Sequence, residues 1–234
     1  MRAYIVLLIA IFLSPGFSHA GGMDDDPLLT MLVVEQLEIR VTDGEDPLVW
    51  EAEGWIGKDL NKFWIKTEGE YVDDRVEEAE LQMLYSRALA PFWDLQLGWR
   101  HDIRPTPERD WLALGMKGLA PYYFDVDAAL FLGDAGRTAA RLQVEYELML
   151  TQKLVLIPEI ELNLHGKNDS DTGTGSGLSD IEAGLRLRYE VRREFAPYVG
   201  VNWTKLYGKT ADFARDEGED VEDVQFVFGV SFWF

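Results

Sequence analysis

The C-terminal segment shows the clearest alternation of side-chain character in the chain. Residues 224–234 run VQFVFGVSFWF, so every second position from Val224 to Phe234 is Val or Phe. A period of two predicts a β-strand. Four phenylalanines on one face of a strand are rare in a soluble sheet. They are typical of outer-membrane strands, whose outward face contacts lipid while the other face lines a polar lumen.

The same alternation recurs along the chain and predicts an all-β fold, a transmembrane antiparallel β-barrel of about twelve strands, with ten as the alternative count. Strands of ten to fourteen residues are long for a soluble sheet but suit tilted strands that cross a bilayer. The predicted strands are 28–41, 47–57, 61–72, 76–89, 92–103, 109–118, 121–133, 137–150, 153–165, 179–193, 196–208 and 221–234.

The connections between these strands alternate in length. The two longest, at 166–177 and 209–220, both follow odd-numbered strands, while the turns at 58–59, 90–91, 120–121 and 151–152 follow even-numbered ones. Outer-membrane barrels have long outer loops and short periplasmic turns, with both chain ends in the periplasm. The pattern therefore predicts an even strand count, and a location in the bacterial outer membrane.

The N-terminal residues predict export. Arg2 precedes the apolar run 3–13, and Ser18-His-Ala20 forms a small-x-small cleavage site, which together are typical of a cleaved signal peptide. We expect three parts: signal peptide 1–20, a short acidic periplasmic lead-in 21–27, and the outer-membrane barrel 28–234. No later segment reaches the length of an apolar transmembrane helix.

Composition narrows the possible functions. The formal net charge of −20 argues against nucleic acid as a partner, because phosphate recognition needs Lys and Arg. The same charge favours cations or basic partners. Cysteine is absent, so thiol chemistry and disulfides are excluded. No nucleophile elbow, phosphate loop or HExxH motif occurs, and we expect a protein that is not an enzyme.

Alternation also assigns carboxylates to the lumen. Folding 137–150 against 153–165 places Glu145 opposite Glu159, and Glu161 near Gln143. Directly opposed like charges are unfavourable, so a proton, a neighbouring Arg or a bound cation must offset them. An arginine network and a metal site both remain open for this region; its candidate metal ligands are Glu145, Glu159 and Glu161.

A second group of carboxylates flanks the predicted outer turn at 73–75. Glu68 and Glu70 approach the turn, and Glu78 and Glu80 return beside them on the same face. Basic neighbours are expected to be scarcer here, although Glu51 opposite Lys66 predicts one ion pair nearby. These four glutamates are candidate metal ligands in a cation-attracting mouth, with a salt-bridge network as the alternative. The lumen-facing bases that could form it are Arg100, Arg141, Arg186, Arg188, Lys62 and Lys66.

Two further residues complete the set of candidate metal ligands. Met149 is the methionine that alternation places most clearly in the lumen, and His165 lies at the outer end of its strand near Asp169 and Asp171. His165 could equally be a rim histidine in water. A hydrolase that uses His165 with one of these aspartates is a third, weaker alternative.

Several segments together resemble the copper-resistance protein B (CopB/PcoB) family, and the similarity covers essentially the whole predicted barrel. The run 175–189, GSGLSDIEAGLRLRY, followed by 193–200, REFAPYVG, is the most specific. The other matching segments are 61–70, 84–88, 99–102, 118–127, 131–134, 136–141 and 150–152.

The resemblance implies an outer-membrane protein of copper resistance and homeostasis, which binds copper or passes it across the membrane. It also implies a periplasmic multicopper oxidase as a partner, besides outer-membrane lipid. Family members often have a Met/His-rich segment before the barrel, whereas here 21–27 contain only Met23. Because thioethers suit Cu(I) while carboxylate and imidazole suit Cu(II), a Glu-rich lumen favours Cu(II) as the copper ion bound. Two hypotheses follow. In the first, an acidic lumen guides copper across the membrane. In the second, salt bridges plug the lumen and the barrel serves as a docking protein for the oxidase.

Overall fold

A computed structural model describes residues 26–42 and 44–234 of the chain. The predicted signal peptide, 1–20, and residues 21–25 of the predicted lead-in lie outside the described residues. Within the described part, no helix combines the length and the apolar character that crossing a bilayer would need.

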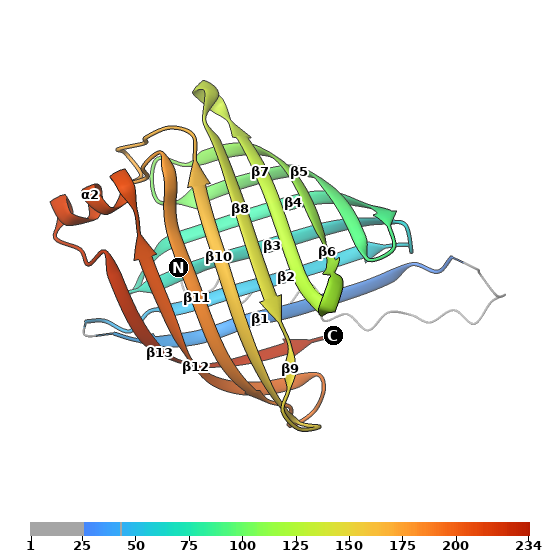
Figure 1. Cartoon of the computed structure of the whole chain (residues 1–234). Helices are drawn as coiled ribbons and strands as arrows, with labels where there is room; N and C mark the ends of the chain where they lie inside the picture. The colour runs from blue at the N-terminus through green and yellow to red at the C-terminus, as the bar shows by residue number, and fades with distance from the viewer. Residues whose placement is uncertain (1–25, 43) are drawn as a thin grey trace.

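The described residues form one closed antiparallel β-barrel (Figure 1). Each strand pairs with its neighbours, and β13 pairs with β1 to close the cylinder. Both β8 and the two-residue β9 pair with β10, so they form one barrel strand and the count is twelve, as predicted. The strands are β1 Leu29–Val41, β2 Leu48–Gly57, β3 Asn61–Val72, β4 Arg75–Ala90, β5 Trp93–Arg104, β6 Arg109–Ala120, β7 Phe124–Gly133, β8 Thr138–Tyr146, β9 Leu148–Met149, β10 Leu154–His165, β11 Gly177–Tyr189, β12 Phe195–Leu206 and β13 Glu222–Trp233.

The two faces of each strand differ as the sequence pattern predicts. On β7, Leu130 and Leu132 point outward and are more than half exposed, whereas Phe131 between them faces the lumen with 1% of its surface exposed. On β13, Phe226 and Phe228 are exposed on the outer wall, while Val227 is fully buried. An apolar outer wall with a filled interior is the arrangement that lipid requires of a barrel.

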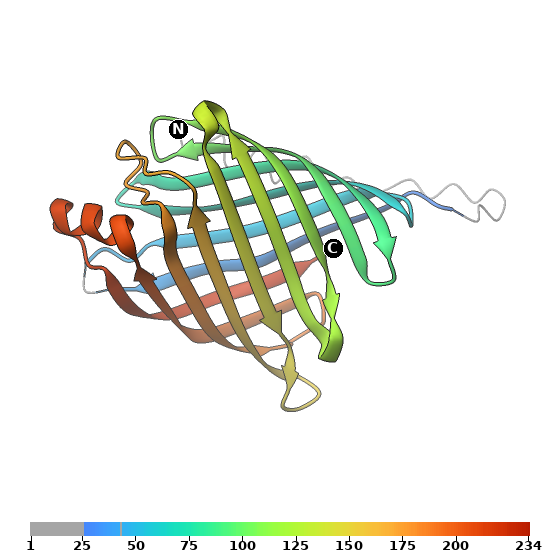
Figure 2. The same ribbon diagram turned by 45° about the horizontal axis from the view of Figure 1, so that its top comes forward.

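The two ends of the barrel differ. The loop 166–176 and the helix α2, Gly208–Glu217, lie at the same end, and the C-terminus lies toward the other (Figures 1 and 2). We call the end with the long connections the outer end, because outer-membrane barrels place them outside the cell. The helix was not predicted; Ala211 and Ala214 are its buried residues, and Gly218 ends it in the left-handed conformation.

The register of strand pairing shifts at several places in the barrel. One shift lies on β1, between Val34 and Gln36, where β1 has one residue more than β2. A bulge inserts an extra residue and can turn two consecutive side chains to the same face. Glu35 consequently lies near lumen-facing Glu53 and Lys117.

Apolar side chains fill part of the lumen. Trp64, Leu84, Trp111 and Phe131 form a buried cluster with Ala113, contributed by β3, β4, β6 and β7. The guanidinium carbon of Arg100 lies 4.5 Å from the ring centroid of Phe131. The interior at this level is therefore packed side chain against side chain.

We predict that replacing Phe131 by Ala lowers the free energy of unfolding by about 3–5 kcal/mol, since a buried ring leaves a cavity that rigid strands cannot close. The measurement is urea-induced unfolding of the barrel in lipid bilayers, followed by tryptophan fluorescence. The matched control is Phe228→Ala on the outer wall, where lipid replaces the lost ring and the loss should be smaller. Equal losses would show that the lumen cluster is not a packed core.

Candidate functional site

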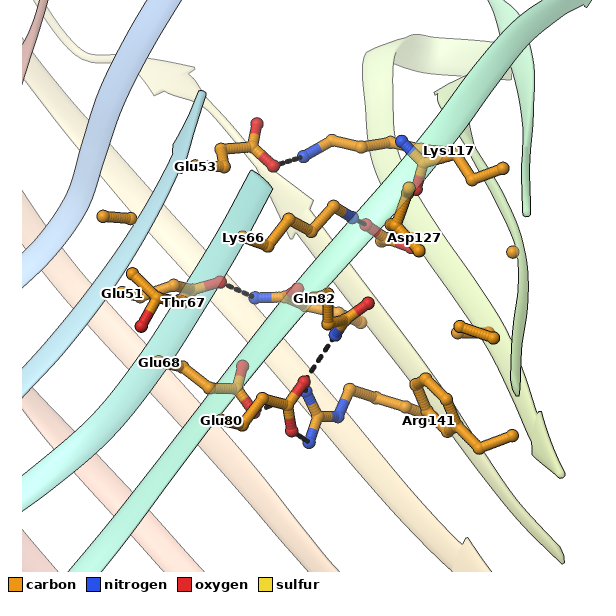
Figure 3. Close-up of a pocket in the computed structure, with 18 residues that line it drawn as sticks. Glu51, Glu53, Lys66, Thr67, Glu68, Glu80, Gln82, Lys117, Asp127 and Arg141 are labelled. Atoms are coloured by element: carbon orange, nitrogen blue, oxygen red, sulfur yellow. Dashed lines mark hydrogen bonds and ion pairs between the residues drawn. The ribbon is translucent and has the colours of Figure 1, made fainter. Parts of the chain in front are cut away.

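Polar side chains from opposite walls meet inside the lumen at several levels (Figure 3). Lys117 on β6 lies 2.6 Å from Glu53 on β2, and Lys66 on β3 pairs with Asp127 on β7. Farther toward the outer end, Gln143 on β8 donates to Glu51 on β2 at 3.2 Å. None of these strand pairs are neighbours in the sheet, so each contact crosses the interior of the barrel.

Arg141 on β8 forms the outermost contact in this series. Its guanidinium lies 2.5 Å from Glu68 on β3, 3.2 Å from Glu80 on β4 and 3.3 Å from Glu161 on β10. Arg100 adds a second cation, 2.8 Å from Glu80. Glu68 and Glu80 stand opposite each other in the β3–β4 register. The two arginines neutralise charges that would otherwise repel.

A second cluster lies against β1 and β11. Arg186 contacts Glu38 at 2.9 Å and Glu159 at 2.7 Å, and it also donates to the side-chain oxygen of Gln36. Glu38 is fully buried and accepts further hydrogen bonds from Arg40 and from the Tyr198 hydroxyl. Every charge that this cluster buries has an oppositely charged partner, which is the condition for keeping ions in an interior.

The two opposed pairs predicted for the β8–β10 hairpin are confirmed. Glu145 stands opposite Glu159, and Glu161 opposite Gln143. Glu159 is stabilised by Arg186, Gln36 and Gln143, and Glu161 by Arg141 and Asn163. Within the described structure the Glu145 side chain has no ion pair. The arginine network therefore accounts for Glu159 and Glu161, but not for Glu145.

The expected scarcity of bases around the second group is wrong for two of its four members. Glu68 and Glu80 contact Arg141, which reaches them from the opposite wall. The expected pair of Glu51 with Lys66 is also wrong, because Lys66 stands opposite Glu53 in the β2–β3 register while Glu51 stands opposite Glu68. The register error is two residues, from Glu51 to Glu53, which alternation alone cannot exclude because both lie on the same face of the strand.

Glu70 and Glu78 behave differently. They stand opposite each other one level farther out, and their side chains have no ion pair or hydrogen bond among the described residues. Glu78 lies near enough to Asp180 and Glu182 of β11 for electrostatic repulsion. Asp180 accepts a hydrogen bond from Asn163, and Glu182 pairs with Arg40. We call these four carboxylates, Glu70, Glu78, Asp180 and Glu182, the acidic mouth.

A cavity of about 40 Å³ lies among the cross-lumen contacts. Glu68, Glu80 and Arg141 line its outer end, and Glu53 and Lys117 line the other end (Figure 3). Gln96 also lines it, and its side-chain nitrogen is buried without a hydrogen-bond partner. Since a water needs roughly 10–15 Å³ of such volume, the cavity has room for only a few waters.

The two remaining candidate ligands lie at opposite ends of the barrel. Met149 stands opposite lumen-facing Val155 near the periplasmic end and is mostly exposed. His165 lies at the outer end, where its Nδ1 is 2.7 Å from the Ser179 hydroxyl. The structure thus does not bring them together with the glutamates. Across 26–42 and 44–234, no group of three or more Asp, Glu and His side chains is placed to hold a metal ion.

The loop 166–176 is fixed over the outer end. Asp169 lies 3.0 Å from Arg109 on β6 and 2.9 Å from Arg137 before β8. On its other side, the Gly175 amide donates to the Thr210 hydroxyl of α2. The sequence suggests Asp169 only as a partner for His165, whereas in the structure its ion pairs with Arg109 and Arg137 fix the loop.

Comparison with known proteins identifies the family. A family model described as "Copper resistance protein B precursor (CopB)" matches residues 28–234. The chain belongs to the copper resistance protein B family. A relative from Pseudomonas syringae pv. tomato, "Copper resistance protein B homolog", is 45% identical over 218 residues, which cover 93% of this chain and 74% of the relative. "Copper resistance protein B" of Escherichia coli is 44% identical over 219 residues, covering 94% of this chain and 74% of the relative.

The fold agrees with this membership. The "NanC porin" structure superposes with a TM-score of 0.58 at 12% identity, over 86% of this chain and 98% of the porin. So low an identity shows the fold alone. Together with the family match, it makes this copper resistance protein B relative a barrel of the bacterial outer membrane.

We predict that Arg186→Met lowers the free energy of unfolding by about 3 kcal/mol or more, since it leaves buried Glu38 and Glu159 without their shared cation. Urea unfolding in bilayers measures the loss. The control is Arg188→Met on the same strand, whose pairs with Glu147 and Glu190 lie toward the exposed periplasmic end. The double variant Arg186→Met with Glu38→Leu should recover part of the loss. No recovery would contradict the assignment of the penalty to unpaired charge.

Proposed function

We propose that this barrel serves copper resistance without catalysis, by attracting copper ions to the acidic mouth and guiding them across the outer membrane through its lumen. The observation that supports the proposal most directly is the excess of carboxylate at the mouth. Glu70 and Glu78 form no ion pair in the described structure, while Asp180 and Glu182 face them from β11, and Arg40 and Arg141 are the nearby cations. Such an excess of one charge sign concentrates cations at an entrance.

The chemistry of the lumen favours Cu(II) over Cu(I) as the ion that is guided. Carboxylate and amide oxygens line the cavity beside Lys66, Lys117 and Arg141, and carboxylates form the acidic mouth; these oxygen donors suit Cu(II) and harder ions. The thioether of Met149, which would suit Cu(I), lies near the periplasmic end. In this proposal the mouth attracts copper through its field and binds it weakly. Of the candidate glutamates, Glu70 and Glu78 then attract the ion, whereas Glu68, Glu80, Glu159 and Glu161 have arginine partners. Glu145 has no ion pair in the described structure and lies away from the mouth.

A second candidate function is favoured by the contacts that cross the lumen. A barrel closed by ion pairs between opposite walls could serve as a structural or docking protein, whose periplasmic turns hold a multicopper oxidase near the membrane. Exposed aromatic residues at those turns, Phe92, Tyr122 and Tyr123, are compatible with a docking surface or with contact to lipid headgroups. Copper transport by the isolated barrel separates the two functions, because docking requires none.

We predict that the variant Glu70→Gln/Glu78→Gln loses most of its ability to restore copper tolerance to a deletion strain, since two carboxylates that form no ion pair leave the entrance. The measurement is growth in copper at equal outer-membrane levels of wild type and variant. The matched control is Glu217→Gln/Glu219→Gln, which removes two charges from exposed positions in the outer loop between β12 and β13.

Each outcome decides one part of the proposal. Rescue by wild type and by the control, but not by the mouth variant, supports guidance by the acidic mouth. Equal rescue by all three removes the mouth from the proposal and favours the docking function. Failure of wild type to rescue would contradict a role in copper resistance for this chain.

A further inference from the structure

Arg141 lies between two parts of the lumen. Outward of it is the acidic mouth, since Glu70 and Glu78 follow Glu68 and precede Glu80 on the adjacent strands β3 and β4. Inward of it is the cavity of about 40 Å³, whose outer end Arg141 lines with Glu68 and Glu80. A cation that passes from the mouth to the cavity must cross this level.

The guanidinium contacts side chains from three other strands at that level. Its contacts to Glu68, Glu80 and Glu161 run from β8 to β3, β4 and β10, and its Nε also donates to Asn163 at 3.1 Å. An arginine keeps its charge at any physiological pH, so deprotonation does not release these contacts. The carboxylates become available to another cation only when the side chain moves.

The surroundings of Arg141 allow such a movement more readily than those of Arg186. Glu68, its most exposed partner, has a side chain that is 33% exposed, whereas Glu38 beside Arg186 is fully buried. Glu80 would keep one cation when Arg141 leaves, because Arg100 is held separately by Asp102 at 2.7 Å and by the ring of Phe131.

We propose that Arg141 is the outer gate of the lumen, a tethered cation that closes the way from the acidic mouth to the cavity by occupying Glu68, Glu80 and Glu161 until an incoming cation displaces it. A divalent ion interacts with these carboxylates more strongly than a monovalent ion does, so the gate favours multivalent cations. This inference goes beyond the copper proposal and is tested without copper, so that either can fail alone.

The first test is conductance of the full barrel in planar bilayers bathed in potassium chloride. Lys66–Asp127 and Lys117–Glu53 also cross the lumen, so the reference barrel carries Lys66→Gln, Asp127→Asn, Lys117→Gln and Glu53→Gln, which remove both pairs without leaving an unpaired charge. The reference should conduct little, and adding Arg141→Gln should raise its conductance at least about tenfold, with a reversal potential that shows cation selectivity. Adding Arg188→Gln removes the same charge near the periplasmic end and should leave the conductance of the reference unchanged. Equal conductance with and without Arg141→Gln would overturn the proposal, as would an equal rise with either substitution.

A second pair of variants guards against loss of folding. Arg141→Gln/Glu68→Gln removes both partners of the shortest contact and leaves less unpaired charge, and it should also conduct. Arg141→Lys keeps a positive charge and should stay nearly closed. A difference in migration between unheated and heated samples in SDS gels confirms that each variant is a folded barrel. A folded double variant that conducts no more than the reference barrel would contradict the gate.

A chemical test separates the charge of Arg141 from its packing. Because the chain has no cysteine, Arg141→Cys introduces a single thiol. The variant should conduct, aminoethyl methanethiosulfonate should close it again by restoring a cation, and the anionic sulfonatoethyl reagent should leave it open. Closure by both reagents would show that bulk, and not charge, blocks the lumen, and would overturn the proposal.

Discussion

The narrow interior of a closed barrel constrains every other feature of this protein. Half of the positions of each strand must face that interior, and here many of them carry charge. A charge removed from water is stable only beside an opposite charge and with its hydrogen bonds satisfied. The lysines and arginines reach across the lumen to glutamates and aspartates on the opposite wall, so the side chains that neutralise the interior also fill it.

Much of the barrel could be predicted from alternation. The outward phenylalanines of β13 and the alternating long and short connections predicted the twelve strands, the two faces of each strand and the pairing of Glu145 with Glu159. The pairing of residues on neighbouring strands could be predicted because a hairpin turn sets the register between them. The helix α2 was missed, although Ala211, Ala214 and a final Gly218 are a recognisable signal for a short helix with a glycine end.

The partners across the lumen could not be predicted in the same way. Which residue of β8 meets which residue of β3 depends on the tilt and stagger of the closed barrel, which no local pattern specifies. Arg141 was recognised as a lumen residue, but its contact with Glu68 was not. On β1 the register shifts between Val34 and Gln36. Val33, which pairs with Glu53, and Gln36, which pairs with Glu51, therefore face the same side although one is odd-numbered and the other even-numbered. A single alternation along β1 cannot place both in the lumen, and so does not reveal the cluster that Gln36 forms with Arg186.

Arg186 and Arg141 apply the same chemistry, one cation shared by several carboxylates, in two different surroundings. Both neutralise several glutamates, yet Arg186 is enclosed by Gln36, fully buried Glu38 and the hydrogen-bonded Tyr198. Moving it would leave buried charge with nothing to replace it. Arg141 instead has the acidic mouth on one side and a cavity on the other, and the ion that would displace it brings the compensating charge itself. An ion pair is therefore an obstacle only to species that cannot substitute for one of its members, and in a lumen built from carboxylates, the species that can are cations.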